Sequence, residues 1–230
     1  MIVGNDARKL VADGYPLEQV VISDLRQGGL FAWTGKRHHL LTCFVLAEFA
    51  DIGHKLFRTT QETYPITFVT GDVFDAKHLD VVPPLASTHD LTGASEGPAL
   101  DLGSLTSLNP LRGRVFAIHA SYFFHFFSEA RQLHIARALA GLLSPEPGSI
   151  IFGLHTGLAD KGFVTSPMGD HQMFCHSPES WAQLWDGIVF EKGVVDVKVK
   201  LVHMGREDPD AEQHAFFAAF TVLEWSVTRL

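Results

Sequence analysis

The chain has 230 residues, of which 46% are hydrophobic and 19% are charged, and its formal net charge is -8 with an isoelectric point near 5.9. This acidic balance argues against a general nucleic-acid binder, whose affinity comes from clustered Lys and Arg. Two cysteines, Cys43 and Cys175, are too few for a disulfide scaffold and favour a reducing compartment. Charge begins at Asp6, and the longest apolar run is well short of the roughly 20 residues that span a bilayer. We therefore expect a cytoplasmic protein of one domain, residues 1–230, with neither nucleic-acid nor membrane partners.

The first 80 residues alternate between helix-like and strand-like segments. The residues after Gly4 predict a helix, with Asn5 or Asp6 as its N-cap and Gly14 as its C-terminal stop. Apolar residues at helical spacing predict a second helix, and short β-branched runs predict buried strands. The second helix covers 48–60, and the strands cover 20–23 and 66–69.

The remaining residues continue this alternation and then change character. A stretch from 83 to 110, rich in Ser, Thr, Gly and Pro, predicts a long surface loop. The segments after it are a strand (114–121), a helix capped by Ser128 (128–143), a strand (149–155), a helix capped by Ser177 (176–187) and two strands (194–202 and 214–225). Because no helix fits between the last two strands, they should pair antiparallel. Helical spacing also predicts an inward stripe of Trp181, Leu184, Trp185 and Ile188.

This order of elements indicates an α/β fold with a mainly parallel sheet and helices on both of its faces. A terminal antiparallel hairpin is less common among such folds. A mainly parallel sheet with this ending resembles the Rossmann-like sheet of class I S-adenosylmethionine (SAM) methyltransferases. Sheets of this kind bind ligands at the carboxyl ends of their strands, so candidate functional residues are sought there.

Two acidic residues follow two of the predicted strands. Asp24 ends the first strand, 20 residues after Gly4, and a glycine turn with an acid at that separation can hold a ribose. Asp72 ends the next strand, where it can accept a hydrogen bond from an adenine amino group while Val73 or Phe74 covers a ring face. Each residue alone also fits an ordinary turn. Together they favour a nucleoside site.

Histidines near later strand ends are the candidate catalytic residues. His125 lies in "HASYFFHFF" and His155 ends the following strand, and both are candidates for a general base. The ordinary alternative for each is a packed or surface histidine. "HQMFCH" contains His171, Cys175 and His176 without a partner pair at zinc spacing, so no metal is expected.

Longer motifs carry a more specific resemblance. "GNDARKLVADGYP", "FVTGDVFD" and "MFCHSPESWAQLWDG", with others along nearly the whole chain, resemble fungal SAM-dependent methyltransferases of meroterpenoid and other secondary-metabolite pathways. The resemblance implies SAM as cofactor and methyl transfer to a carboxyl or hydroxyl oxygen of a small organic acceptor. The predicted cofactor contacts are Gly4, Asp24, Leu25, Asp72, Val73, Ala120 and Ser121.

The chain departs from this family in two places. The family has a helical segment, a strand and a glycine loop that run into the equivalent of Gly4, so we expect a truncated copy whose first strand is largely missing. Residues 28–47 interrupt a family-like run. We interpret them as a translated intron, and a genuine loop over the active site is the alternative.

The sequence is compatible with three functions. The first is an active methyltransferase for a small molecule, and the second is a catalytically inactive, truncated methyltransferase-like binding protein. The third is a nicotinamide-dependent oxidoreductase, which the terminal hairpin and the incomplete glycine motif disfavour. The sequence makes no prediction of the oligomeric state.

Overall fold

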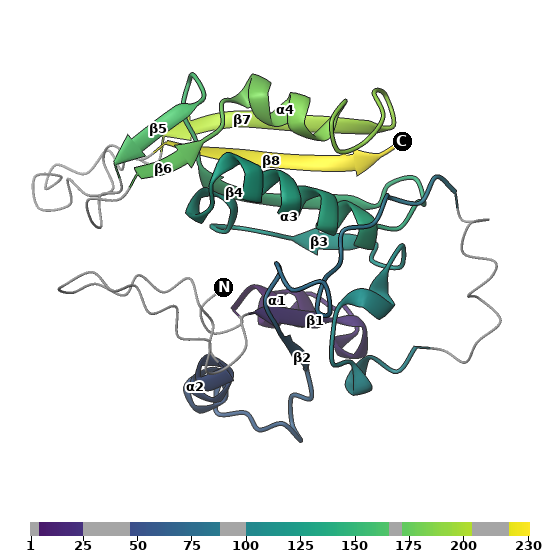
Figure 1. The fold of residues 1–230 in the computed structure, drawn as a ribbon. Helices are drawn as coiled ribbons and strands as arrows, with labels where there is room; N and C mark the ends of the chain where they lie inside the picture. The colour runs from purple at the N-terminus through teal and green to yellow at the C-terminus, as the bar shows by residue number, and fades with distance from the viewer. Residues whose placement is uncertain (1–4, 25–46, 88–99, 166–171, 204–220) are drawn as a thin grey trace, which may run out of the picture. The chain divides into compact units, whose positions relative to one another are not determined.

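The computed structural model describes residues 5–24, 47–87, 100–165, 172–203 and 221–230, drawn in colour in Figure 1. Gly4, Leu25 and all but the last residue of the predicted insert lie outside the described residues. The chain divides into two compact units, which are described one at a time. Unit 1 comprises residues 1–80 and 94–110, and unit 2 comprises 81–93 and 111–230. A single domain over 1–230 stays a prediction.

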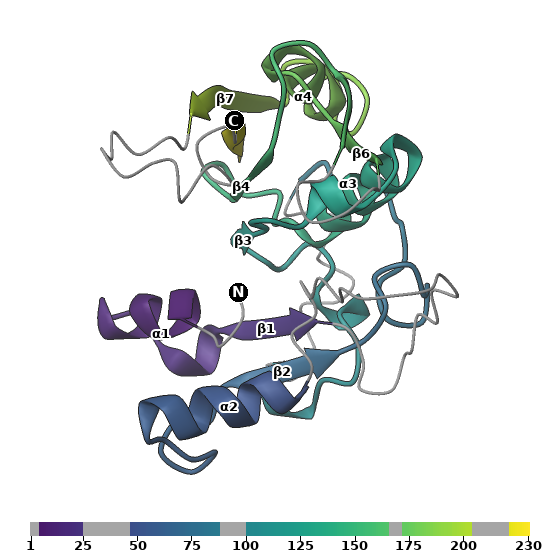
Figure 2. The same ribbon diagram turned by 90° about the vertical axis from the view of Figure 1, so that its left-hand side faces the viewer.

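Unit 1 is built on two parallel strands, each preceded by a helix. The elements are α1 (Asn5–Ala12), β1 (Val21–Asp24), α2 (Ala47–Phe57) and β2 (Thr67–Thr70). The two strands pair in parallel and lie side by side in Figure 2. The predicted alternation of helix and strand is confirmed, with the bounds of the strands shifted by one residue.

A small apolar cluster joins α1 to the two strands. Ala7 on α1 is buried with Val20 and Ile66, which directly precede β1 and β2. The helix stops before Gly14, whose φ of 103° is a left-handed conformation that favours glycine. This turn directs the chain toward β1, so the helix stop predicted from Gly14 is confirmed.

Unit 2 contains a four-stranded sheet in the order β3-β4-β8-β7. β3 is parallel to β4, whereas β8 is antiparallel to both β4 and β7. β5 and β6 form a separate antiparallel pair. The elements are β3 (Ala117–His119), α3 (Glu129–Leu142), β4 (Ile150–Thr156), β5 (Gly162–Thr165), β6 (Gln172–Cys175), α4 (Pro178–Trp185), β7 (Val195–His203) and β8 (Thr221–Arg229). The Rossmann-like α/β class with a C-terminal antiparallel hairpin is thereby confirmed.

Several local features differ from the expectation. The β5–β6 pair is not among the predicted elements, and β6 has no β-branched residue, unlike β1 and β2. Ile188 is 53% exposed rather than inward, because α4 ends at Trp185 and helical spacing no longer applies beyond it. Ser128 occupies the N-cap position of α3 but makes no side-chain capping bond. Ser177 does form the expected cap of α4, as a capping box with Ser180.

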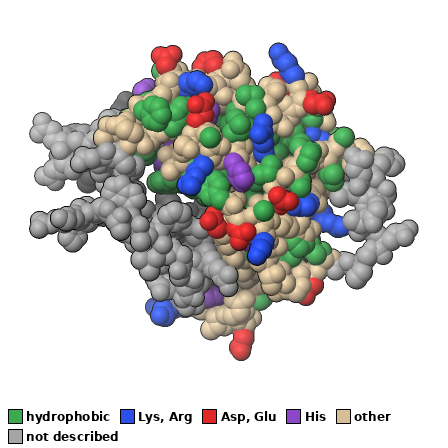
Figure 3. All heavy atoms as spheres, viewed as in Figure 1, with side chains coloured by type: hydrophobic (Ala, Val, Ile, Leu, Met, Phe, Trp, Pro, Cys, Tyr) green, Lys and Arg blue, Asp and Glu red, His purple; other side chains and the backbone are tan. Residues whose placement is uncertain are grey.

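Charges of both signs are interspersed on the face drawn in Figure 3. Two of the exposed ion pairs are Lys200 with Glu224, across β7 and β8, and Lys161 with Glu129, each at 3.1 Å. Exposed pairs of this kind contribute at most about 1 kcal/mol, so the stability of unit 2 rests on its buried contacts. None of the helices within the described ranges has the length and apolarity needed to cross a membrane.

Gln132 is a buried polar side chain that ties three elements of unit 2 together. It lies on α3 with no exposed surface, and its Nε2 donates to the carbonyl oxygens of Phe127 and Phe174, each at 2.9 Å. Phe127 follows a short 3-10 helix (Phe124–Phe126), and Phe174 lies on β6. The amide therefore couples the loop after β3, α3 and β6.

We expect Gln132→Leu to lower the free energy of unfolding by about 2–4 kcal/mol, because two carbonyl groups lose their buried donor. Urea unfolding at pH 7 measures this change. Gln183→Leu is the matched control, since Gln183 is exposed on α4 and its replacement should change the free energy by less than about 0.5 kcal/mol. Equal effects of the two substitutions would contradict this account of Gln132.

Candidate functional site

The ends of β1 and β2 bring the two predicted acids onto neighbouring strand tips. In the parallel register Asp24 pairs with Thr70, and Gly71 and Asp72 follow directly after that paired residue. The carboxyl ends of parallel strands lie at the same edge of the sheet, which is where doubly wound folds bind ligands. Adjacent strands are about 5 Å apart, so the two backbone segments are within reach of one small ligand.

Asp72 begins a tight turn after β2. One carboxylate oxygen, Oδ1, accepts a hydrogen bond from the backbone N–H of Phe74 at 2.9 Å, and the Asp72 carbonyl accepts one from Asp75 at 3.0 Å. The side chain is half-buried, as are Val73 and Phe74. The turn fixes the carboxylate through Oδ1. Asp72 therefore does belong to an ordinary turn, as its position in the sequence also allowed, and this turn is compatible with a binding role for the side chain.

Ala120 and Ser121 lie beyond the end of β3 in unit 2. The Ser121 hydroxyl accepts a hydrogen bond from the backbone N–H of Leu154 at 3.2 Å and bonds the His119 ring at 2.7 Å. The Ala120 carbonyl packs so closely on Gly153 that a Cβ there would come within 2.3 Å of its oxygen. Both residues thus join β3 to β4, and a role in cofactor binding stays a prediction for them.

Tyr122 marks a strained turn directly after these residues. Its φ is 52°, a left-handed value that a bulky side chain rarely adopts, and its N–H donates to the Leu154 carbonyl at 2.6 Å. The contact holds the unfavourable backbone in place. Strain of this kind costs about 1–3 kcal/mol and is concentrated at functional sites, so this strand end is structurally distinct from the others.

His125 and His155 lie together in an aromatic cluster of unit 2. Their ring centroids are 6.5 Å apart, and the His155 ring is 4.5 Å from that of Trp181 on α4. His155 is 1% exposed, and its Nδ1 is 2.9 Å from Nε1 of Trp225. An indole N–H only donates, so Nδ1 of His155 is the acceptor and the proton of the neutral ring resides on Nε2.

Burial keeps these histidines uncharged. It lowers the pKa of His125 to about 4, and it lowers the pKa of His155 well below the usual 6.5, assisted by the neighbouring His125 and His176. General bases work best when their pKa lies near the working pH. His155 also has its one lone-pair nitrogen engaged by Trp225, so His125 is the better base candidate, and it is a weak one.

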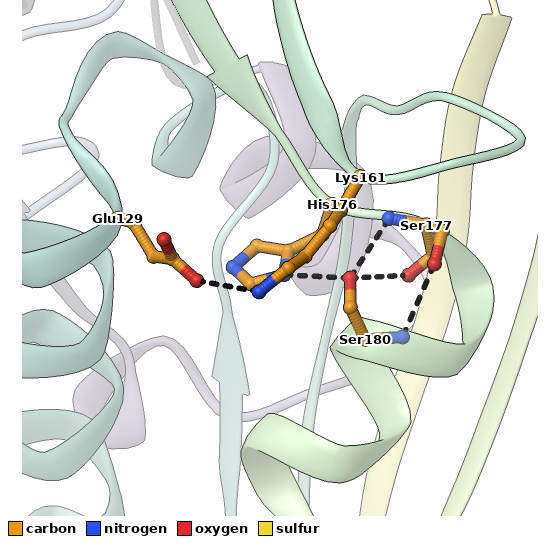
Figure 4. Close-up of polar contacts among 5 residues, drawn as sticks. All are labelled: Glu129, Lys161, His176, Ser177 and Ser180. Carbon is orange, nitrogen blue, oxygen red and sulfur yellow. Dashed lines mark hydrogen bonds and ion pairs between the residues drawn. The ribbon is translucent and has the colours of Figure 1, made fainter.

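His176 and Cys175, singled out in the "HQMFCH" motif, have structural environments. Figure 4 shows His176 beside the capping box of α4, with Nδ1 2.9 Å from the Ser180 hydroxyl. Burial raises the pKa of the Cys175 thiol to about 11 and lowers the pKa of His176 to about 4. Within the described ranges, no group of three or more His, Cys, Asp or Glu side chains is placed to hold a metal ion.

The contacts of two residues, His78 and Trp225, could not be predicted from the sequence. His78 lies against the turn after β2, and Trp225 fixes the tautomer of His155. Both contacts join residues more than five positions apart, which periodicity cannot reveal.

The buried histidines make unit 2 sensitive to acid. Their pKa values lie below 6.5 in the folded chain, so the unfolded chain binds more protons between about pH 6.5 and 4. The contribution of these histidines to the free energy of unfolding is therefore complete above pH 6.5, and it is lost as the pH falls toward 4. For His125 and His176 together we expect a loss of roughly 2–4 kcal/mol between pH 7 and 5, measured by urea unfolding.

His125→Gln should remove the share of His125, which is about half of the loss expected for His125 and His176 together. His203→Gln is the control, because His203 is exposed at the end of β7, and it should keep the full dependence. If the two variants show the same slope of stability against pH, burial of His125 is not the cause.

Comparison with known proteins identifies relatives of the chain as fungal methyltransferases. It is 29% identical over 191 residues to the O-methyltransferase phiE of Fungal sp. (strain ATCC 74256), which covers 83% of this chain and 48% of that relative. It is 24% identical over 205 residues to the Asnovolin E/Chermesin D methyltransferase nvfJ of Aspergillus novofumigatus, covering 89% and 55%. Methyltransferase adrK of Penicillium rubens is 23% identical over 211 residues, covering 92% and 58%. The resemblance to fungal methyltransferases is confirmed.

The chain spans about half the length of these curated relatives. No protein-family model matches it. Among solved structures, an S-adenosylmethionine dependent methyltransferase from Mesorhizobium loti aligns with 63% of this chain and 77% of that chain, at 13% identity and a TM-score of 0.33.

Proposed function

We propose that the chain is a SAM-dependent methyltransferase that acts on a small organic acceptor in secondary metabolism. The observation that carries the proposal is the parallel pairing of β1 and β2, which sets Asp24 and Asp72 on adjacent strand tips. The names of the fungal relatives support methyl transfer as the reaction. The relatives named above are methyltransferases, which favours methyl transfer over a nicotinamide-dependent reaction.

The acids at the ends of β1 and β2 suit the nucleoside part of SAM. In this proposal Asp24 accepts hydrogen bonds from the ribose hydroxyls, and Asp72 accepts one from the adenine amino group. The turn bond from Phe74 to Oδ1 of Asp72 holds that carboxylate in place before the ligand arrives. Val73 covers a face of the base. Contacts of Gly4, Leu25, Ala120 and Ser121 with the cofactor stay predictions from the sequence.

The remaining demands on the protein are small. SAM supplies, when bound, a methyl group already activated on a sulfonium centre, so the chain has mainly to orient the acceptor and exclude water. We propose oxygen as the methylated atom. A carboxylate acceptor needs no base, and a hydroxyl acceptor would use His125, whose low pKa makes it a weak base.

Asp72→Asn tests the proposal without removing the turn. The amide oxygen can still accept from Phe74, but the charge is lost, so we expect affinity for S-adenosylhomocysteine to fall about 10- to 100-fold in isothermal titration calorimetry. Asp75→Asn is the matched control, because Asp75 accepts a similar local bond from Lys77 in the same loop. It should bind within about twofold of the unchanged protein.

The outcomes separate the two remaining functions. Binding together with methyl transfer supports the proposed enzyme, and binding without transfer to any acceptor supports the inactive binding protein. Equal affinity in the Asp72 and Asp75 variants would contradict the assignment of Asp72.

A further inference from the structure

His78 contacts both strand ends that carry the proposed nucleoside site. The ring is 5% exposed and lies in the loop after β2. Its Nε2 is 3.3 Å from the hydroxyl of Ser23, the residue before Asp24. The Nδ1 side of the ring packs on Gly71, the residue before Asp72. One side chain therefore touches the immediate neighbour of each acid.

The contact with Gly71 leaves no room for a side chain. A Cβ built on Gly71 would lie 2.1 Å from Nδ1 and 2.2 Å from Cγ of His78, distances that real Cβ atoms do not reach. The approach involves the body of the ring rather than the tip of a flexible chain. Glycine at this position is thus explained by close packing, and the imidazole determines how near the loop comes to the end of β2.

The ring cannot easily move away, because the backbone on both sides of it is held. The His78 N–H donates to the Asp75 carbonyl at 2.8 Å, and the His78 carbonyl accepts from Leu108 at 2.9 Å. The next residue, Leu79, is 1% exposed. The Asn109 amide adds bonds to the carbonyls of residues 76 and 77 at 2.9 and 3.1 Å. The segment around Leu108 therefore fixes the loop that presents His78.

We propose that His78 is a positioning residue, which sets the separation of Asp24 and Asp72 by bracing Ser23 against Gly71. This inference rests on the proposed nucleoside site. The ring need not touch the ligand. A site that grips a sugar and a base with two carboxylates depends on their spacing, and a misplacement of about 1 Å in such a site can cost on the order of 100-fold.

Three substitutions test the brace through the affinity for S-adenosylhomocysteine. We expect His78→Ala to weaken binding about tenfold or more, and His78→Gln to restore much of it, because an amide can still bond the Ser23 hydroxyl. Ser23→Ala removes only the hydrogen bond and should weaken binding by roughly two- to fivefold. His54→Ala is the control, since His54 bonds Thr59 beside α2 in the same unit. It should leave the affinity unchanged.

A double-substitution cycle separates positioning from general loss of structure. Gly71→Ala should weaken binding at least tenfold in the unchanged protein, but by no more than about twofold when His78 is already Ala, because the clashing ring is gone. Circular dichroism and thermal melting establish that each variant is folded. Where another variant does not fold, Ser23→Ala provides the test of the contact between His78 and Ser23.

The proposal is overturned if folded His78→Ala binds within twofold of the unchanged protein, or if Gly71→Ala costs the same in both backgrounds. Failure of the proposed function gives a result that can be told apart from failure of this inference. In that case the unchanged protein itself does not bind S-adenosylhomocysteine.

Discussion

One backbone interaction, the parallel pairing of β1 with β2, positions the proposed nucleoside site. Because Asp24 pairs with Thr70, the chain leaves both strands at the same edge with an acid at each exit. A shift of one residue would turn every side chain of a strand to the opposite face. The apolar cluster of Ala7, Val20 and Ile66 sits at the other end of the pair and holds that register.

Unit 2 places its polar groups in a different environment. The rings of Phe124, Trp181 and Trp225 surround His155, with centroids 4.5 to 5.9 Å away. Such surroundings favour the neutral imidazole, and the indole of Trp225 determines its tautomer. The aromatic cluster therefore holds a neutral histidine in one tautomer, and it does not provide a strong base. That property agrees with a reaction in which the methyl donor is already activated.

Much of this fold could be predicted from the sequence, because its elements carry local signals. Gly14 stops α1, Ser177 caps α4, and alternation predicts β7. The rule that parallel strands end at one edge was sufficient to place Asp24 and Asp72 on adjacent tips. β6 has no β-branched residue and so lacks the signal that predicts β1 and β2. The role of His78 depends on a contact with Ser23, 55 positions away, which no local pattern encodes.

The central claim is that the carboxylates of Asp24 and Asp72 hold the two parts of one adenosyl group. The most direct test is a crystal structure of the protein with S-adenosylhomocysteine. The account predicts the ribose hydroxyls within hydrogen-bond distance of Asp24 and the adenine amino group within that distance of Asp72. A nucleoside bound elsewhere, with both carboxylates pointing to solvent, would contradict it.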